Sequence, residues 1–263
     1  MMNALNAHNG RMNDVHQNWS SDAFEQSAWM PRHNWYTPIK FAVEFLGAVM
    51  LLVLAAPVIL LAALFVKATS SGPAFYSQTR LGRFGRHYTI FKLRTMTHNC
   101  EDQSGPCWAL PEDPRITLVG HFLRKTHIDE LPQLWNVLRG DMSLVGPRPE
   151  RPEFLPSLEH AIPHYRDRLL VRPGVTGLAQ VQLPPDTDMA SVRLKLSYDL
   201  YYIRSHNPLL DFRIVFCTVF HVAGVPYELL RRLFNMPSDI KIQHAYRSAT
   251  PASLPIPHMQ AAV

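Results

Sequence analysis

Two adjacent carboxylates, Asp129 and Glu130, lie just before a proline in the stretch THIDELPQLW. Pro132 is tolerated in the first turn of a helix but not deeper, so a helix is predicted to begin close to Asp129. A carboxylate there often caps free backbone N–H groups, and Thr126 and Asp129 have the spacing of a capping box. The same position predicts a depressed pKa and an ionised carboxylate that binds Mg²⁺ or attacks phosphorus. The residues alone leave capping and chemistry open.

A group of cations precedes these carboxylates. Positions 80 to 94 contain no Asp or Glu and five cations, namely Arg80, Arg83, Arg86, Lys92 and Arg94. Lys92 and Arg94 alternate along a predicted strand and therefore share one face, which favours a phosphate site. The first three arginines fit a patch that holds anionic lipid equally well. Two carboxylates among many cations are what a site for Mg²⁺ and a diphosphate needs.

Two stiff loops carry further candidate residues. In GDMSLVGPRPE, Arg148 is held between two prolines, which suits bidentate recognition of phosphate, although a solvated arginine in a turn is the plainer interpretation. Asp141 in the same stretch either orients Arg148 or helps to hold metal, and the sequence does not choose between these roles. Arg172 begins the loop RPGVTG and is weak evidence by itself.

A long apolar segment precedes all of these motifs. Residues 45–66, FLGAVMLLVLAAPVILLAALFV, contain no charge, and Lys40 and Lys67 bracket them. At about 1.5 Å per residue, a helix of this length crosses a hydrocarbon core of ~30 Å. The alternative is a buried core helix. Pro57 predicts either a kinked spanning helix or a break that returns the chain to the side it entered.

The predicted fold is α+β and mainly helical, with a short β-hairpin and interfacial amphipathic helices in a small catalytic domain. The predicted segments are a disordered polar tail (1–38), a membrane helix broken at Pro57 (39–67), the catalytic domain (68–235) and a flexible C-terminal tail (236–263). Within the domain we expect strands at 74–77 and 87–91 joined by a turn at 81–86, and helices at 119–138 (interrupted at 126–129), 156–170 and 189–206. Residues 212–234 fit an interfacial helix or a core-facing one equally well.

Composition narrows the class of protein. Of the 263 residues, 47% are hydrophobic, and the net charge is +5. This modest positive charge suits contact with phosphates or with an anionic membrane. No nucleic-acid recognition motif accompanies it. The three cysteines form no CxxC pair, which fits a reducing compartment. A zinc site is disfavoured because the spacing matches no standard ligand pattern; the residues considered are His98, Cys100, Cys107 and His121.

Taken in order, these motifs resemble the bacterial sugar transferases that are monotopic phosphoglycosyl transferases, in their minimal catalytic form. The resemblance covers about residues 40–225: the apolar segment with its central proline, then FKLRTM, then ITLVGHFLRKTHIDELPQLWNVLRGDMSLVGPRPERPEF, then RPGVTGLAQV. In many members the proline follows a serine, whereas this chain has Ala56 before Pro57. The family anchor is a re-entrant helix with both ends cytosolic.

The resemblance also implies an activity and roles for residues. Asp129 matches the nucleophile and the Mg²⁺ ligand, Glu130 matches the second member of the catalytic pair, whose role stays open, and Lys92, Arg124 and Arg148 match residues that hold phosphate or nucleotide. The implied reaction moves a hexose-1-phosphate from a UDP-sugar to undecaprenyl phosphate, releases UMP and passes through a phosphosugar–aspartyl intermediate. It would begin exopolysaccharide, capsule, O-antigen or glycoconjugate synthesis at the cytoplasmic face of the bacterial inner membrane. The hexose, the pathway and homo-oligomerisation remain open.

Competing functions explain less of the sequence. A glycosyltransferase that releases UDP would need a nucleotide-binding α/β domain, and no alternation of strands and helices predicts one. A polytopic phosphoglycosyl transferase is excluded by the single long apolar segment. A membrane-bound scaffold accounts for the anchor and the tails but not for the Asp-Glu pair, the arginines and the Gly-Pro loops.

Overall fold

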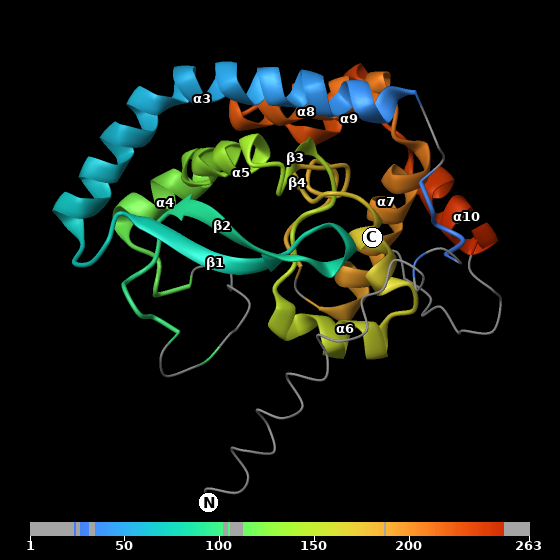
Figure 1. Ribbon diagram of the computed structural model, residues 1–263, viewed down its shortest axis with the longest axis horizontal. Helices are drawn as coiled ribbons and strands as arrows, with labels where there is room; N and C mark the ends of the chain where they lie inside the picture. The colour runs from blue at the N-terminus through green and yellow to red at the C-terminus, as the bar shows by residue number, and fades with distance from the viewer. Residues whose placement is uncertain are drawn as a thin grey trace, which may run out of the picture.

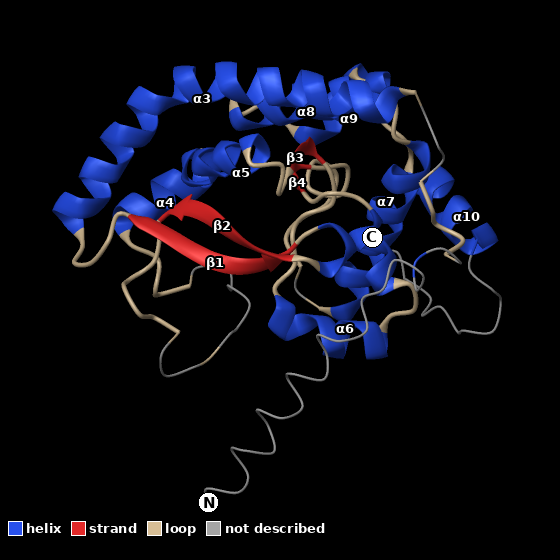
Figure 2. Cartoon of the chain, viewed as in Figure 1, coloured by secondary structure: helices blue, strands red, loops and turns tan. Residues whose placement is uncertain are grey.

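The computed structural model describes residues 24, 27–31, 35–101, 105, 113–186 and 188–249. They form the predicted mainly helical α+β fold, and its strands make two small two-stranded sheets (Figures 1 and 2). In chain order the elements are α3 (Tyr36–Thr69), β1 (Phe75–Leu81), η1 (Arg83–Gly85), β2 (His87–Leu93), α4 (Leu118–Lys125), η2 (Ile128–Gln133), α5 (Leu134–Leu138), β3 (Ser143–Val145), η3 (Pro152–Phe154), α6 (Leu155–Ala161), η4 (Tyr165–Leu170), β4 (Gly174–Thr176), α7 (Met189–Ser205), α8 (Pro208–Val222), α9 (Tyr227–Leu233) and α10 (Asp239–Ala249).

Helix α3 is the apolar segment, and it is one continuous helix of 34 residues rather than two helices separated by a break. Pro57 lies inside it, and Figure 1 shows that the ribbon bends in its C-terminal half. A proline removes one helical hydrogen bond and bends the axis without ending the helix, provided that the other bonds persist. Within the described residues, α3 alone is long and apolar enough to cross a membrane.

Both halves of α3 pack against the same domain. Near its start, Ala48 is buried in a cluster with residues of β2 and α5. Near its end, Ala62, Ala63 and Val66 are buried against Leu93 and Leu123. Between Lys40 and Lys67 most of the outer surface of the helix is exposed and apolar, and small side chains lie on its inner face.

Two charged residues of α3 are buried in this contact. The Lys40 ammonium donates to Glu44 Oε1 at 2.8 Å, to Asp211 Oδ2 at 2.5 Å and to the Val145 carbonyl at 3.1 Å. Glu44 accepts hydrogen bonds from the Ser143 hydroxyl and the Val145 backbone N–H. Because the two side chains satisfy both main-chain groups of Val145, they fasten β3 to the membrane helix.

The hairpin is longer than predicted. β1 and β2 pair antiparallel from Phe75↔Leu93 to Leu81↔His87, and η1 forms the predicted turn with Phe84 in the left-handed region. The second sheet, a parallel pair of β3 and β4, was not predicted. Its three-residue strands are too short for an alternating pattern. They approach so closely that a Cβ on Gly174 would lie 2.1 Å from the Gly146 nitrogen, which explains the glycines in both loops.

The predicted helices are found with changes at their ends. Residues 119–138 form α4, η2 and α5, interrupted near 126–129 as expected, and α7 begins with a capping box between Asp188 and Ser191. Residues 156–170 divide into α6 and η4. Residues 212–234 fall in α8 and α9, which lie along α3 in Figure 1 and expose Phe212, Phe220 and Leu233. The inner face of α8 is buried, so this region has both an exposed apolar side and a core-facing side.

Parts of both predicted tails belong to the fold, which corrects the boundaries at 38 and 236. Phe24 and Trp29 are 1% and 0% exposed in the core, and the Trp29 ring stacks on Tyr246 of α10 at 5.8 Å between centroids. Single aromatic residues in polar sequence carry no periodicity, so the pattern could not reveal their burial. Of the two predicted tails, residues 1–23, 25–26, 32–34 and 250–263 lie outside the described residues.

Removal of the Lys40 ammonium should be costly. In Lys40→Ala, the Glu44 and Asp211 carboxylates would be left buried without their cation, and we expect a loss of about 3–5 kcal/mol in the free energy of unfolding. Thermal unfolding in detergent measures the effect. Lys67→Ala is the matched control, because the Lys67 ammonium is exposed on the same helix. Equal melting temperatures for the two variants would contradict the stabilising role of Lys40.

Candidate active site

The Asp129–Glu130 pair lies on η2, directly after a reversal of the chain. Helix α4 ends at Lys125, and His127 adopts a left-handed conformation with φ of 55° before η2 begins. The Thr126 hydroxyl bonds back to the Phe122 carbonyl at 2.9 Å, and no side chain caps η2. The predicted capping box is therefore not formed, and the carboxylate of Asp129 is not used as a cap.

Glu130 is held by two cations. Lys92 Nζ from β2 lies 2.7 Å from Glu130 Oε1, and Arg148 Nη2, from the loop after β3, lies 2.8 Å from the same oxygen. Burial alone would raise the pKa of Glu130. The positive charges of Arg148 and Lys92 outweigh that effect and hold this pKa well below its ordinary value. Glu130 is thus a fixed anion that unites two distant segments of the chain.

Asp129 is in the opposite condition. Asp129 is 7% exposed. Within the described part of the chain, its carboxylate takes part in no hydrogen bond or ion pair. Burial, together with the negative charge of Glu130, raises the pKa of Asp129 to about 6, while Lys92 and Arg124 oppose the rise. The depressed pKa expected from a helix N-terminus is therefore wrong, because desolvation dominates. A buried carboxylate without a partner is available to a cation or an electrophile.

The structure brings together only part of the predicted set. Arg124 belongs to the cluster, since its charge acts on Asp129 and its Nε donates to Thr95 at 2.9 Å. Arg94 instead donates to the carbonyl and hydroxyl of Ser70 and fastens the C-terminal end of α3. Lys92 and Arg94 were expected on one face of a strand. They contact different parts of the protein, Glu130 and Ser70, because β2 ends at Leu93.

The two remaining candidates also lie elsewhere. Asp141 pairs with Arg139 at 3.2 Å rather than orienting Arg148. The Arg172 guanidinium lies 4.1 Å above the ring of Phe41 on α3, where it contacts the membrane helix. Neither residue interacts with Glu130 in the structure, so the predicted phosphate cluster reduces to Lys92, Arg124 and Arg148.

The loop that carries Arg148 is held through its main chain. The Pro147 carbonyl accepts from the Gly174 N–H at 2.8 Å, the Pro149 carbonyl accepts from Arg80 Nη1 at 3.2 Å, and the Glu150 carbonyl accepts from the Leu81 N–H at 2.9 Å. Arg80, predicted to belong to a phosphate or lipid patch, instead donates a hydrogen bond to the main chain of this loop. No pattern in the sequence predicts that role, because it depends on contact between distant segments.

The donor set fits Mg²⁺ only in part. Among the described residues there is no group of three or more His, Cys, Asp or Glu side chains that could hold a metal, and Cys107 of the zinc alternative lies outside them. Asp129 nevertheless offers free carboxylate oxygens. Mg²⁺ commonly takes one or two carboxylates and completes its shell with water and substrate phosphates. Asp129 would therefore hold the ion together with a bound diphosphate.

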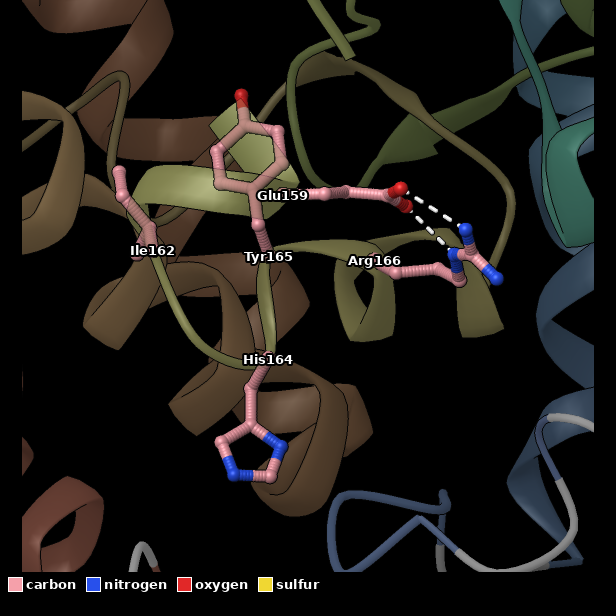
Figure 3. A pocket seen from close by; sticks show the side chains of 5 residues that line it. All are labelled: Glu159, Ile162, His164, Tyr165 and Arg166. Carbon is pink, nitrogen blue, oxygen red and sulfur yellow. Dashed lines mark hydrogen bonds and ion pairs between the residues drawn. The ribbon is translucent and has the colours of Figure 1, made fainter. Parts of the chain in front are cut away.

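A separate cavity of about 250 Å³ lies at α6 and η4. Figure 3 shows its lining residues and the ion pair between Glu159 and Arg166. The hydroxyl of Tyr165 bonds to Glu150 at 2.8 Å. None of the lining residues belongs to the cluster around Asp129, so this cavity is not the candidate active site.

The chain belongs to the bacterial sugar transferase family, whose model matches residues 35–224. It is 43% identical over 184 residues to the UDP-N-acetylgalactosamine-undecaprenyl-phosphate N-acetylgalactosaminephosphotransferase of Aeromonas hydrophila, covering 70% of this chain and 43% of that protein. The UDP-glucose:undecaprenyl-phosphate glucose-1-phosphate transferase of Caulobacter vibrioides is 46% identical over 182 residues, 68% of each chain.

One relative is matched over nearly its whole length. The exopolysaccharide production protein PSS of Rhizobium leguminosarum bv. phaseoli is 40% identical over 186 residues, which are 69% of this chain and 93% of that protein. By contrast, this chain spans less than half the length of the Aeromonas relative. The matched region contains every residue of the cluster around Asp129.

The raised pKa of Asp129 predicts how activity depends on pH. If ionised Asp129 reacts, kcat/KM for the donor should fall about tenfold per pH unit below a pKa near 6, because the carboxyl is then protonated. Lys92→Met removes a charge that lowers this pKa, so its acid limb should move to higher pH. Lys125→Met is the control, since Lys125 lies on α4 and is exposed. An acid limb that stays in place in Lys92→Met would contradict this assignment.

Proposed function

We propose that the protein transfers a hexose-1-phosphate from a UDP-sugar to undecaprenyl phosphate and releases UMP. The observation that carries the proposal is the buried Asp129 carboxylate, which has no hydrogen-bond or ion-pair partner among the described residues and lies beside the ion-paired Glu130. The names of the Aeromonas and Caulobacter relatives support undecaprenyl phosphate as the acceptor and a UDP-sugar as the donor. The name of the Rhizobium relative supports a place in exopolysaccharide production.

The first step would be displacement at phosphorus. A carboxylate oxygen of Asp129 attacks the sugar-linked phosphorus of the donor, the bond to the bridging oxygen breaks, and UMP leaves with the electron pair. Lys92, Arg124 and Arg148 would hold the phosphate oxygens and offset their charge. Mg²⁺, when bound, would neutralise further charge on the diphosphate. The product on the enzyme would be a phosphosugar–aspartyl intermediate, in which the Asp129 carboxylate and the phosphate form an acyl phosphate.

The second step would return Asp129 to its starting state. An oxygen of undecaprenyl phosphate attacks the same phosphorus, and the bond to the Asp129 oxygen breaks and restores the carboxylate. Division of one displacement into two allows a soluble donor and a lipid acceptor to use one small site in turn.

The electrostatics favour Asp129 over Glu130 as the nucleophile. Glu130 Oε1 is engaged by two cations, and its low pKa makes it a weak base. Asp129, with a pKa near 6, is ionised at neutral pH and more basic than an ordinary aspartate. A more basic oxygen of the same type is generally the stronger nucleophile. Burial thus raises the pKa of Asp129 and makes its carboxylate more nucleophilic. The depressed pKa expected from the sequence would have made it less nucleophilic.

The exposed apolar surfaces support a membrane site. α3 exposes Leu46, Val53 and Leu60, and α8 and α9 expose Phe212 and Leu233. Because both halves of α3 pack on one domain, we propose that the helix enters and leaves the same leaflet. The catalytic domain would lie on the cytoplasmic face of the bacterial inner membrane, where a soluble UDP-sugar meets the lipid acceptor.

Nucleotide release tests the reaction. With undecaprenyl phosphate, Mg²⁺ and a panel of UDP-sugars, wild type should release UMP, and Asp129→Asn should lose at least about 10³-fold in kcat. Asp188→Asn is the control, because Asn caps the start of α7 as well as Asp does. Release of UDP instead of UMP would refute the proposal in favour of an ordinary glycosyltransferase.

Cysteine labelling tests the topology. In a background without native cysteines, Trp35→Cys and Ser71→Cys place thiols at exposed positions on either side of α3. If the helix re-enters, a membrane-impermeant maleimide should label both from the same side of sealed vesicles. Labelling of the two thiols from opposite sides would show that α3 spans the membrane.

A further inference from the structure

A buried arginine lies directly behind the loop of Arg148. Arg168 is on η4, and its side chain is 8% exposed. Its Nη2 donates to the main-chain carbonyl of Arg148 at 2.9 Å and to Asp199 Oδ2 at 2.8 Å. Its Nη1 donates to the Tyr165 hydroxyl at 2.6 Å and to Glu150 Oε2 at 3.2 Å. One guanidinium therefore bridges the turn from Arg148 to Glu150.

Burial of the Arg168 guanidinium costs free energy, and its contacts are specific. Removal of a guanidinium from water carries a desolvation penalty of several kcal/mol, and apolar packing of the same volume often stabilises a protein as well or better. Arg168 meets four acceptors, among them Asp199 on α7, which is itself buried. The planar, fork-shaped guanidinium donates to all four acceptors in fixed directions, which the point charge of a lysine does not do. Stability alone does not account for a charge placed here.

The side chain of Arg148 needs a fixed starting point. It is 48% exposed and reaches across the site to Glu130. A long exposed arginine loses much rotamer freedom when it is ordered, so its position depends on the main chain that carries it. The carbonyls of Pro147 and Pro149 are held by Gly174 and Arg80, and the Arg148 carbonyl between them is held by Arg168.

We propose that Arg168 is a positioning residue, which sets Arg148 for contact with the donor phosphate through the Arg148 carbonyl. This inference rests on the proposed function for its kinetic consequence, but its structural consequence does not depend on any reaction. Arg168 itself touches neither substrate nor the reacting atoms.

The kinetic test compares single and double variants. Arg168→Lys keeps the charge but loses the fork, so it should raise KM for the UDP-sugar and lower kcat/KM by about 10- to 100-fold. A merely structural loss would lower the amount of active enzyme and leave KM unchanged. In an Arg148→Ala background, Arg168→Lys should add no further loss, because its effect passes through Arg148. Arg166→Lys is the control on the same element, since Arg166 pairs with Glu159 outside the cluster.

Hydrogen–deuterium exchange provides the second readout. Amides of residues 146–151 should exchange faster in Arg168→Lys than in wild type, and Arg166→Lys should match wild type. Unchanged exchange in this loop, an unchanged KM, or losses that multiply in the double variant would overturn the proposal. If wild type released no UMP at all, the proposed reaction would fail while the exchange comparison still decided the role of Arg168.

Discussion

The site depends on the double ion pair at Glu130. One carboxylate oxygen accepts from Lys92 on the hairpin and from Arg148 on the loop after β3, segments more than fifty positions apart in the chain. Both partners are charged and the carboxylate is largely buried, so the attraction is much stronger than that of a surface pair. Because Lys92 and Arg148 both pair with Glu130, the adjacent Asp129 is left ionisable and, among the described residues, without a hydrogen-bond or ion-pair partner. Two neighbouring acidic residues thus acquire different protonation behaviour from their surroundings.

Within the described residues, buried charged side chains connect distant segments of the chain at three places. Lys40 and Glu44 connect the membrane helix to β3, Glu130 connects η2 to the hairpin, and Arg168 connects η4 to the loop of Arg148. Each is close to the segment from β3 to Glu150. A small domain with an apolar helix over one face has limited core with which to order such a loop, and directional polar contacts supply the geometry that apolar packing does not.

Sequence patterns predicted those features that depend on neighbours along the chain. The length of the apolar segment and the interruption at 126–129 are encoded by local composition and by prolines. Residue types drew attention to Asp129, Glu130 and Arg148, but only the family resemblance implied roles for them, and these roles stay predictions. The pKa of Asp129, the separate places of Arg94 and Arg172, and the β3–β4 pair depend on which segments meet in space. Lys92 and Arg94 show the limit clearly: alternation suggested one shared face, but the strand ends between them.

The contact between Trp29 and Tyr246 has a consequence for where this domain ends. Both residues lie outside the region matched by the family, yet one is fully buried and both join the core around η4 and α7. Arg204 of α7 lies over the Trp29 ring at 5.5 Å. The segments before and after the matched region therefore contact each other and pack against α7, the helix that carries Asp199. Excision of the domain at the limits of family similarity would cut through its hydrophobic core rather than through a linker.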